Sequence, residues 1–563
     1  MNPLHNSTRT LAPLLAAALL PTFLAFSQPP SPTVYNQLLA LALGGTALAL
    51  LAGRPAAGQV RDARALVAAL GLCAAVTTAS VVAGNLPAGL GFATAGFVLA
   101  AAALVAGGAR ASGDSALRQA FFTAWLLAGL CSAFVAVGQV FMPQALDGDW
   151  FAHSSAPGRA VGNLRQPNHL ASLLLWSALA VLPLHAAARL RAAVAVPVFA
   201  WLVFALVLTA SRTAVVGVVV LALWGVLDRR LPRFARGLLI AAPLMYVVGW
   251  AFMSWWAQTT AQTFVGAARL AGEGLSGGSR PLIWRDTLAL VAAQPWLGVG
   301  AGEYNLAWSL TPSPQRSGEF FDHSHNLPLQ LLAEYGVLLG GAVIALLLVA
   351  LWLAWKRSAA NIELRTAFMM VLLMGVHSQL EYPLWYAYFL LPTAWAWGLC
   401  LGATDAAPRA GGQAIALRIG GATMVAAALF AAIDYRRVVL VYAPGTSEAP
   451  LAERIADGQR SLLFPHHADY AAATMAEHPG TQMAALQRAS HYLLDTRLMT
   501  AWAVAYAEQG DLERARHLAE RLREFNNPAS VEFFAPCKAA GASAPFQCAP
   551  PGRALDWRDF VAR

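Results

Sequence analysis

The chain has 563 residues, of which 58% are hydrophobic and only 12% are charged. Apolar segments of about 20 residues recur along it, and each is long enough to cross the hydrocarbon core of a bilayer. The net charge of +9 does not indicate nucleic-acid binding, because most of the excess falls in short loops between apolar segments. The composition therefore indicates an all-α polytopic membrane protein that does not bind nucleic acid.

The sequence predicts about 13 membrane-spanning helices. The first, 10–27, could be taken for a signal peptide, but it lacks a clear small-residue cleavage site and another apolar segment follows it. We therefore interpret it as a transmembrane helix. The remaining predicted spans are 34–53, 66–83, 88–107, 120–141, 168–187, 193–210, 213–227, 237–256, 335–355, 366–380, 386–403 and 416–434.

The loops between these spans determine the orientation. If the N-terminus lies inside, every inside loop carries Arg or Lys, whereas the first two outside loops, 28–33 and 84–87, carry neither. Basic residues concentrate on the cytoplasmic face of membrane proteins. We therefore expect a cytoplasmic N-terminus and a C-terminus on the outer side.

Three outside segments are long enough to fold. They are the loops 142–167 and 257–334 and the tail 435–563. The tail contains amphipathic helical patterns, one of which resembles a tetratricopeptide-type hairpin. We expect a transmembrane catalytic domain, 1–434, that includes both loops, and a helical domain, 435–563. Cys537 and Cys548 lie in the tail and should form a small-loop disulfide in an oxidising compartment.

Four arginines lie on the outer side, where basic residues are otherwise avoided: Arg159, Arg165, Arg212 and Arg280. Guanidinium suits phosphate because its planar fork makes two hydrogen bonds and keeps its charge. Arg212 could instead snorkel or cap a helix. Arg280 precedes Pro281, so it falls at a predicted helix start, which also favours anions. The pattern suggests a bound anion.

A carboxylate close to a membrane boundary, Glu381, is expensive and is expected to be paired. It could orient a histidine, hold an arginine, or form a purely structural ion pair. Arg285 lies five residues after Arg280 and does not share its helical face well. It could pair with an acid such as Asp286 or Glu303.

Two histidines, His323 and His325, precede a predicted span in the sequence FDHSHNLPLQLLAEYG. A neutral imidazole can take a proton from a hydroxyl near neutral pH, so either could be a general base. Either could also be a capping or hydrogen-bonded residue at the membrane interface, and spacing does not choose between them. No carboxylate or thiol lies at a spacing suited to a metal site.

Several segments together resemble the O-antigen ligase and polymerase superfamily. They are GNLRQPNHLAS, TASRTA, RPLIWR followed by QPWLGVGAGEYN, HSHNLPLQLLAEYG and HSQLEYPLWYAYFLLP, and they span roughly 120–400 in order. The first and last are most similar to the protein O-oligosaccharyltransferase branch, whose members glycosylate pilins and other periplasmic proteins.

The resemblance implies a metal-independent glycosyltransferase in the bacterial inner membrane. It would move an oligosaccharide en bloc from undecaprenyl diphosphate to Ser or Thr hydroxyls of a pilin-like periplasmic protein, with inversion and without a cofactor. The family's histidine before Asn corresponds to His325, its arginine after Ser to Arg212, and its large-loop arginine to Arg280. Further candidates for contacting the substrates are Arg159, Arg165, Gln166, Asn168, His169, Arg285, His323, Asn326 and Glu381. Gln166, Asn168 and His169 could instead cap the following helix.

Two other functions fit parts of the pattern. A ligase that transfers glycan to lipid A-core, or a glycan polymerase, would use the same donor. A transporter of the lipid-linked sugar is disfavoured, because transporter sites lie near the bilayer midplane and these charges cluster at one face.

Overall fold

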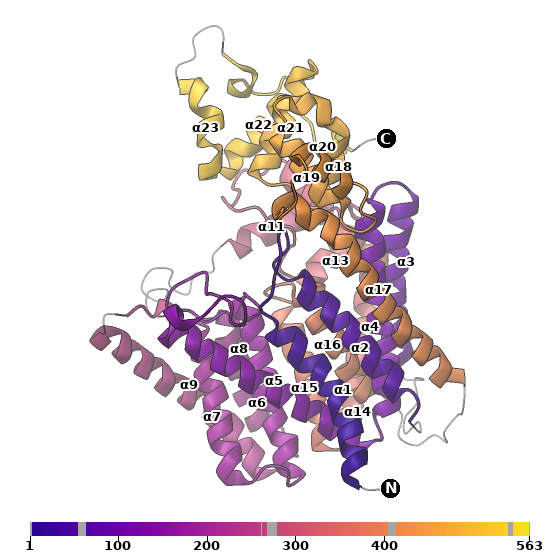
Figure 1. Cartoon of the computed structure of the whole chain (residues 1–563), viewed down its shortest axis with the longest axis vertical. Helices are drawn as coiled ribbons and strands as arrows, with labels where there is room; N and C mark the ends of the chain where they lie inside the picture. Colours follow the sequence, from indigo (N-terminus) through magenta and orange to yellow (C-terminus); the bar gives the residue numbers. More distant parts are fainter. Residues whose placement is uncertain are drawn as a thin grey trace.

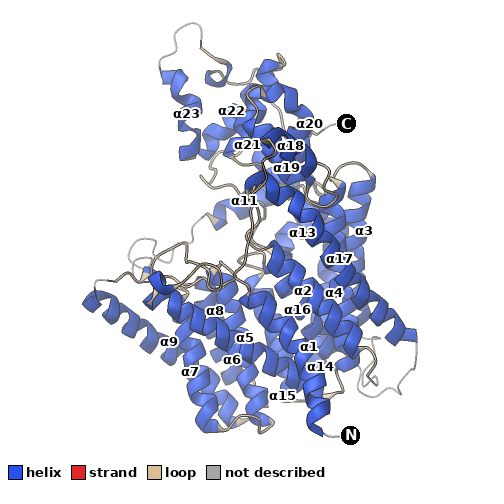
Figure 2. Ribbon diagram, viewed as in Figure 1, coloured by secondary structure: helices blue, strands red, loops and turns tan. Residues whose placement is uncertain are grey.

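The computed structural model describes residues 3–54, 63–260, 262–266, 279–402, 412–538 and 544–561. Within these ranges the chain forms helices and loops and no strand (Figures 1 and 2). The predicted all-α architecture is confirmed. The stretch 267–278 of the predicted loop 257–334 lies outside the described residues.

Each predicted span coincides with a helix. These helices are α1 (Pro3–Phe23), α2 (Val34–Leu51), α3 (Arg64–Val82), α4 (Ala88–Ala111), α5 (Ser115–Phe141), α6 (Pro167–Ala186), α7 (Ala192–Leu208), α8 (Arg212–Leu227), α9 (Arg233–Thr260), α14 (Gly341–Ser358) with α13 (Leu327–Tyr335) before it, α15 (Ile362–His377), α16 (Ala387–Leu401) and α17 (Gly412–Tyr442). In the described part of the chain, 8 helices are long and apolar enough to cross a membrane, and several more are apolar but shorter. The chain is a polytopic membrane protein.

Helix α6 lies in the interior of the membrane layer, whereas α3 lies at its edge. Buried residues make up 89% of the apolar window of α6 but only 22% of that of α3. Helix α6 packs against α5, α7, α8 and α15. A helix that is apolar and buried all round belongs to the core, and one buried on a single side faces lipid. The first turn of α6 is therefore held in a fixed place.

Glycines bring two pairs of helices close together. A Cβ atom on Gly45 of α2 would clash with the carbonyl oxygen of Gly421 in α17. One on Gly398 of α16 would clash with the carbonyl oxygen of Val105 in α4. Small residues allow this close approach of helix backbones in membranes. Helix α16, which follows the loop that carries Glu381, is thereby fixed against α4.

The large loop before α13 is joined to α13 by backbone hydrogen bonds. Val299 N donates to Ala333 O at 2.8 Å, and Gly300 N donates to Glu334 O at 3.0 Å. The loop contains α11 (Arg280–Ala293) and α12 (Tyr304–Leu310). Helix α11 packs against α13 and lies above the membrane-spanning helices in the view of Figure 1.

The C-terminal unit packs on this large loop. It comprises α18 (Leu451–Gly458), α19 (Pro465–Met475), α20 (Met483–Ser490), α21 (Thr496–Glu508), α22 (Leu512–Phe525) and α23 (Val531–Phe534). The predicted boundary at 434/435 falls inside α17, which continues without a break because Pro444 and Gly445 come only after its end. Helices α21 and α22 pack as a hairpin. A disulfide joins Cys537 to Cys548, as predicted (S–S 2.02 Å).

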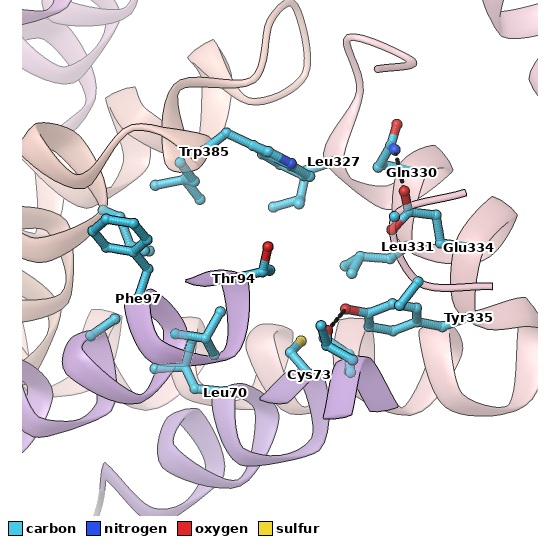
Figure 3. A pocket seen from close by; sticks show the side chains of 18 of the residues that line it. Leu70, Cys73, Thr94, Phe97, Leu327, Gln330, Leu331, Glu334, Tyr335 and Trp385 are labelled. Atoms are coloured by element: carbon cyan, nitrogen blue, oxygen red, sulfur yellow. Dashed lines mark hydrogen bonds between the residues drawn. The ribbon is translucent and has the colours of Figure 1, made fainter. Parts of the chain in front are cut away.

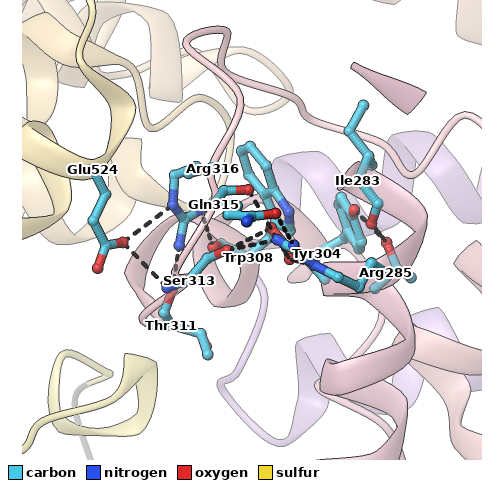
Figure 4. A network of polar contacts seen from close by, with 11 residues as sticks. Ile283, Arg285, Tyr304, Trp308, Thr311, Ser313, Gln315, Arg316 and Glu524 are labelled. Carbon is cyan, nitrogen blue, oxygen red and sulfur yellow. Dashed lines mark hydrogen bonds and ion pairs between the residues drawn. The ribbon is translucent and has the colours of Figure 1, made fainter. Parts of the chain in front are cut away.

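The large loop and the C-terminal unit share one hydrophobic core. Tyr304 and Trp308 of α12 belong to the same buried cluster as Leu498 and Trp502 of α21. Arg316 of the loop is buried between the rings of Trp308 and Phe525, with its guanidinium 4.8 and 4.7 Å from the ring centroids. It also pairs with Glu524 of α22 (Figure 4). The outer part is therefore one folded body built from two distant stretches of sequence.

Candidate active site

The carboxylate of Glu381 joins three segments of the chain. Arg280 Nη2 donates to its Oε1 at 2.6 Å, and Asn168 Nδ2 donates to the same oxygen at 3.1 Å. His325 Nδ1 lies 2.9 Å from its Oε2. We call Asn168, Arg280, His325 and Glu381 the Glu381 cluster. Four segments meet at this cluster: the first turn of α6, the first turn of α11, the residue before the Asn326 cap of α13, and the loop between α15 and α16.

The hydrogen bond to Glu381 determines which nitrogen of His325 is basic. A carboxylate oxygen accepts, so Nδ1 carries the proton and Nε2 keeps its lone pair. Burial raises the pKa of the Glu381 carboxyl, but the hydrogen bond from His325 and the charge of Arg280 outweigh burial and hold the pKa below its ordinary value. Glu381 is therefore an ionised acceptor that holds the imidazole in one orientation.

His325 has a backbone conformation that is rare for residues other than glycine. Its φ is +54°. Arg165 in GNLRQPNHLAS and Ala210 in TASRTA also have a positive φ, at +56° and +45°. Flanking hydrogen bonds hold the turn at His325: Ser324 N donates to Gln330 Oε1 at 2.7 Å. Non-glycine residues in this region are strained and cluster at functional sites. All three lie in motif segments.

Arg212 connects to the cluster through its neighbour Ser211. Arg212 is the first residue of α8, and Ser211 is the N-cap, accepting from Ala214 N at 3.3 Å. Ser211 Oγ donates to Asn168 Oδ1 at 2.5 Å. The start of α8 is thus tied through Asn168 to Glu381. These hydrogen bonds bring together the segments that carry two of the four arginines predicted to bind an anion, Arg212 and Arg280.

Three other predicted arginines contact protein groups outside the cluster. Arg159 Nε donates to Thr209 O at 2.9 Å, and Arg165 donates to the carbonyl of Ala25. These contacts tie the loop 142–167 to neighbouring helix ends. Arg285 pairs with Asp286 at 2.8 Å, one of the two acids considered from the sequence, and lies in the polar network of Figure 4.

The remaining residues predicted around α6 and α13 make local contacts. Gln166 is the N-cap of α6 and accepts from His169 N at 2.7 Å. His169 is buried, with Nδ1 3.0 Å from the hydroxyl of Tyr388. Asn326 is the N-cap of α13 and accepts from Leu329 N at 3.1 Å. Of the residues GNLRQPNH, Asn168 alone donates to Glu381.

His323 lies next to the cluster but belongs to a different surface. Its Nδ1 lies 2.9 Å from Asp322 Oδ1, although the two groups are not aligned for a hydrogen bond. Its ring stacks on Tyr382, with centroids 4.3 Å apart and planes 14° apart. Desolvation raises the pKa of Asp322, but His323 more than offsets this, and the net shift is downward. Sequence reasoning missed Asp322, although it directly precedes His323.

A cavity of about 400 Å³ opens beside His323, and we call it the His323 cavity. Its walls come from α3, α4, α13, α14 and α16. In Figure 3, Cys73 and Thr94 project from the α3 and α4 side, and Tyr335 and Glu334 from the α13 side. Gln330 Nε2 donates to Glu334 Oε1 at 2.9 Å. The cavity is mainly apolar, and its polar lining residues include Asp322, His323, Gln330 and Glu334.

No metal centre is arranged in the described ranges. Among these residues, no group of three or more His, Cys, Asp or Glu side chains could hold a metal ion. The Glu381 cluster itself offers an imidazole, a carboxylate and a guanidinium group.

Comparison with known families finds three matches along the chain. Residues 197–344 match the O-antigen ligase family, and residues 366–531 match the family described as virulence factor membrane-bound polymerase, C-terminal. Residues 160–185, which include Asn168, match the protein glycosylation ligase family.

Two curated proteins of Acinetobacter baylyi are similar to this chain. A general O-oligosaccharyltransferase is 31% identical over 248 residues, which is 43% of this chain and 43% of that protein. A ComP-specific O-oligosaccharyltransferase is 31% identical over 251 residues, or 44% of each. The matched part thus spans less than half the length of these relatives. The chain is thus similar, over separate parts of its length, to the O-antigen ligase family, to the protein glycosylation ligase family and to two proteins named O-oligosaccharyltransferases.

Proposed function

We propose that this protein transfers an oligosaccharide en bloc from a lipid diphosphate to Ser or Thr hydroxyls of a protein. The lipid would be undecaprenyl diphosphate and the acceptor a pilin-like periplasmic protein. Support comes from the two Acinetobacter relatives, which are named O-oligosaccharyltransferases, and from the glycosylation-ligase segment that supplies Asn168. The observation that carries the proposal is the single carboxylate of Glu381 bonded to both His325 and Arg280.

The proposed reaction is one displacement at the anomeric carbon. The acceptor hydroxyl gives its proton to His325 Nε2 while its oxygen bonds to the sugar. The bond between the sugar and the diphosphate breaks, and its electron pair leaves with the lipid diphosphate. One such displacement inverts the anomeric configuration. General-base catalysis of this kind contributes about 10²–10⁴ in rate.

The arginines have a separate role in this proposal. Arg280 and Arg212 would bind the diphosphate and stabilise the negative charge that develops as it leaves, usually a large part of catalysis. Arg280 is already bonded to Glu381, so its guanidinium is held in place before the substrate binds. Its Nε is buried without a hydrogen-bond partner among the described residues.

We also propose that the cluster and the C-terminal unit face the periplasm of a bacterial inner-membrane protein. The basic inside loops support this orientation, as does the disulfide between Cys537 and Cys548, which suits an oxidising compartment. The proposed domains are a membrane domain over 1–434 and a helical unit over 435–563, joined by the continuous helix α17.

The test is an acceptor assay in a host that supplies a lipid-linked glycan, with a pilin-like protein and lipid A-core both present. Wild type and His325→Ala would be compared at matched expression. We expect glycan on the protein with wild type and none with the variant. Glycan on lipid A-core alone would assign a ligase instead. Depletion of the lipid-linked pool without any transfer would favour a transporter.

A further inference from the structure

Two histidine–carboxylate pairs share the ring of Tyr382. His325, paired with Glu381, approaches Tyr382 edge-on, with centroids 5.1 Å apart and planes 76° apart. His323, beside Asp322, stacks on Tyr382. The proposed mechanism uses only the first pair. The second pair is a partly buried imidazole next to a more exposed carboxylate, and the proposed mechanism gives it no task.

The second pair lies on the His323 cavity, and the first does not. Asp322 and His323 are among the residues that line the cavity, whereas Asn168, Arg280, His325 and Glu381 are not. A group inside the cavity can therefore contact His323 and Asp322 directly. His323 in turn shares the ring of Tyr382 with His325, the histidine of the proposed mechanism.

The charges in the cavity disfavour the donor's diphosphate. Asp322 and Glu334 both line it, and no Lys or Arg occurs among the described lining residues. An anionic head group would face carboxylates without a counter-charge, which costs free energy in a partly buried site. A neutral or basic segment with apolar side chains complements the same lining.

The C-terminal unit also contributes to this cavity. His491 and Tyr492, which follow α20, line it together with Leu90, Leu327 and Trp385 from the membrane part. His323 Nδ1 is buried without a hydrogen-bond partner in the described part of the chain. The site thus combines apolar walls, an imidazole beside a carboxylate and residues of the outer unit.

We propose that His323, Asp322 and the adjoining part of the His323 cavity bind the protein acceptor. His323 would hydrogen-bond the acceptor segment beside its hydroxyl, and the apolar walls would take a neighbouring apolar side chain. This inference rests on the proposed function. It makes His323 an acceptor-binding residue and leaves proton removal to His325.

The test separates acceptor binding from donor activation. His323→Ala is expected to raise the KM for the protein acceptor about tenfold, the effect of losing roughly one hydrogen bond, while kcat changes less than about threefold. Release of glycan to water, which needs no protein acceptor, should stay at the wild-type rate. An unchanged acceptor KM, or an equal loss of transfer and of release to water, would overturn the inference.

Two further variants serve as a control and as an independent test of the cavity. His478→Ala removes another histidine beside a carboxylate, Glu508, but on an exposed surface outside the cavity, so it should leave the acceptor KM unchanged. Leu90→Trp narrows the cavity without touching His323 and should raise the acceptor KM, even where His323→Ala fails to fold. An unaltered KM in Leu90→Trp would contradict the proposal.

A crosslinking arm tests the identity of the occupant. A photoreactive residue at Leu90 should capture the protein acceptor that wild type glycosylates. Capture of the lipid-linked donor instead would show that its chain occupies the cavity and would overturn the inference. Absence of glycan transfer to any protein by wild type would overturn the proposed function itself.

Discussion

His491 Nδ1 lies 2.8 Å from both carboxylate oxygens of Glu303. Glu303 belongs to the large loop and its side chain is only 3% exposed, whereas His491 belongs to the C-terminal unit. This contact joins the two stretches that form the outer body, and it borders the His323 cavity through His491.

Removing His491 should destabilise the protein in a pH-dependent way. Burial raises the pKa of Glu303, and the contact with His491 limits the rise. A raised carboxyl pKa favours the folded state below that pKa and costs stability as pH rises through it. His491→Ala should therefore cost roughly 2–4 kcal/mol at neutral pH, from a buried carboxylate left unpaired, and less in mild acid. Thermal unfolding in detergent across pH would measure this, and Glu303→Gln in the same background should restore much of the loss.

Glu381→Gln should impair both the orientation of His325 and the fixing of Arg280. We expect kcat to fall about 10²-fold, in the range found when a partner that positions a functional histidine is lost. The depressed pKa of Glu381 also contributes stability above its unfolded-state pKa, which is lost as pH falls through the lower folded-state value. In Glu381→Gln, the free energy of unfolding should lack this part of its decrease at acid pH. Wild-type turnover in Glu381→Gln would contradict the role of Glu381 as orienting residue.

Arg280→Lys should keep the charge but lose the bidentate fork. Transfer should fall by about 10²–10³ in Arg280→Ala and by a smaller factor in Arg280→Lys, because ammonium binds phosphate as a point charge. Arg285→Lys is the matched control, since Arg285 lies five residues away and pairs with Asp286 in a separate network. Its transfer rate should remain within about threefold of wild type. Equal losses at both positions would indicate a structural role for these arginines.

Asn168→Asp should be more harmful than Asn168→Ala. The amide donates to Glu381 and accepts from Ser211, and an aspartate would place a second carboxylate beside Glu381. Repulsion would raise the pKa of the carboxylate pair and disturb the bond to His325. We expect kcat to fall roughly tenfold more in the aspartate variant than in the alanine variant, with an altered pH profile of transfer. Identical pH profiles would show that Asn168 does not act through Glu381.

Much of the membrane part could be predicted from the sequence, because apolar length and loop charge are local properties. Every predicted span has its helix, and Glu381 is paired with both a histidine and an arginine, two of the partners considered for it. The sequence could not show which of the predicted arginines face the Glu381 cluster and which only contact other parts of the protein. Whether a guanidinium meets a carbonyl, as Arg159 and Arg165 do, depends on which helix end folds beside it.

The outer body was less accessible to sequence reasoning. An amphipathic helix such as α21 reveals that one face is buried but not what covers it. The buried cluster that includes its apolar face also contains Tyr304 and Trp308 of α12, far away in the sequence. The same limit applies to the His323 cavity, whose lining comes from helices at both ends of the chain.

The shared core has a consequence for biosynthesis. Tyr304 and Trp308 leave the ribosome long before Leu498, Trp502 and Phe525 have been made, so these aromatic rings lack their cover during much of translation. The outer body can reach its final form only after helices α21 and α22 have been made. Folding of the loop that carries Arg280 and His325 therefore depends on synthesis of the C-terminal helices. A protein truncated before these helices would lack the packing that stabilises the proposed catalytic loop.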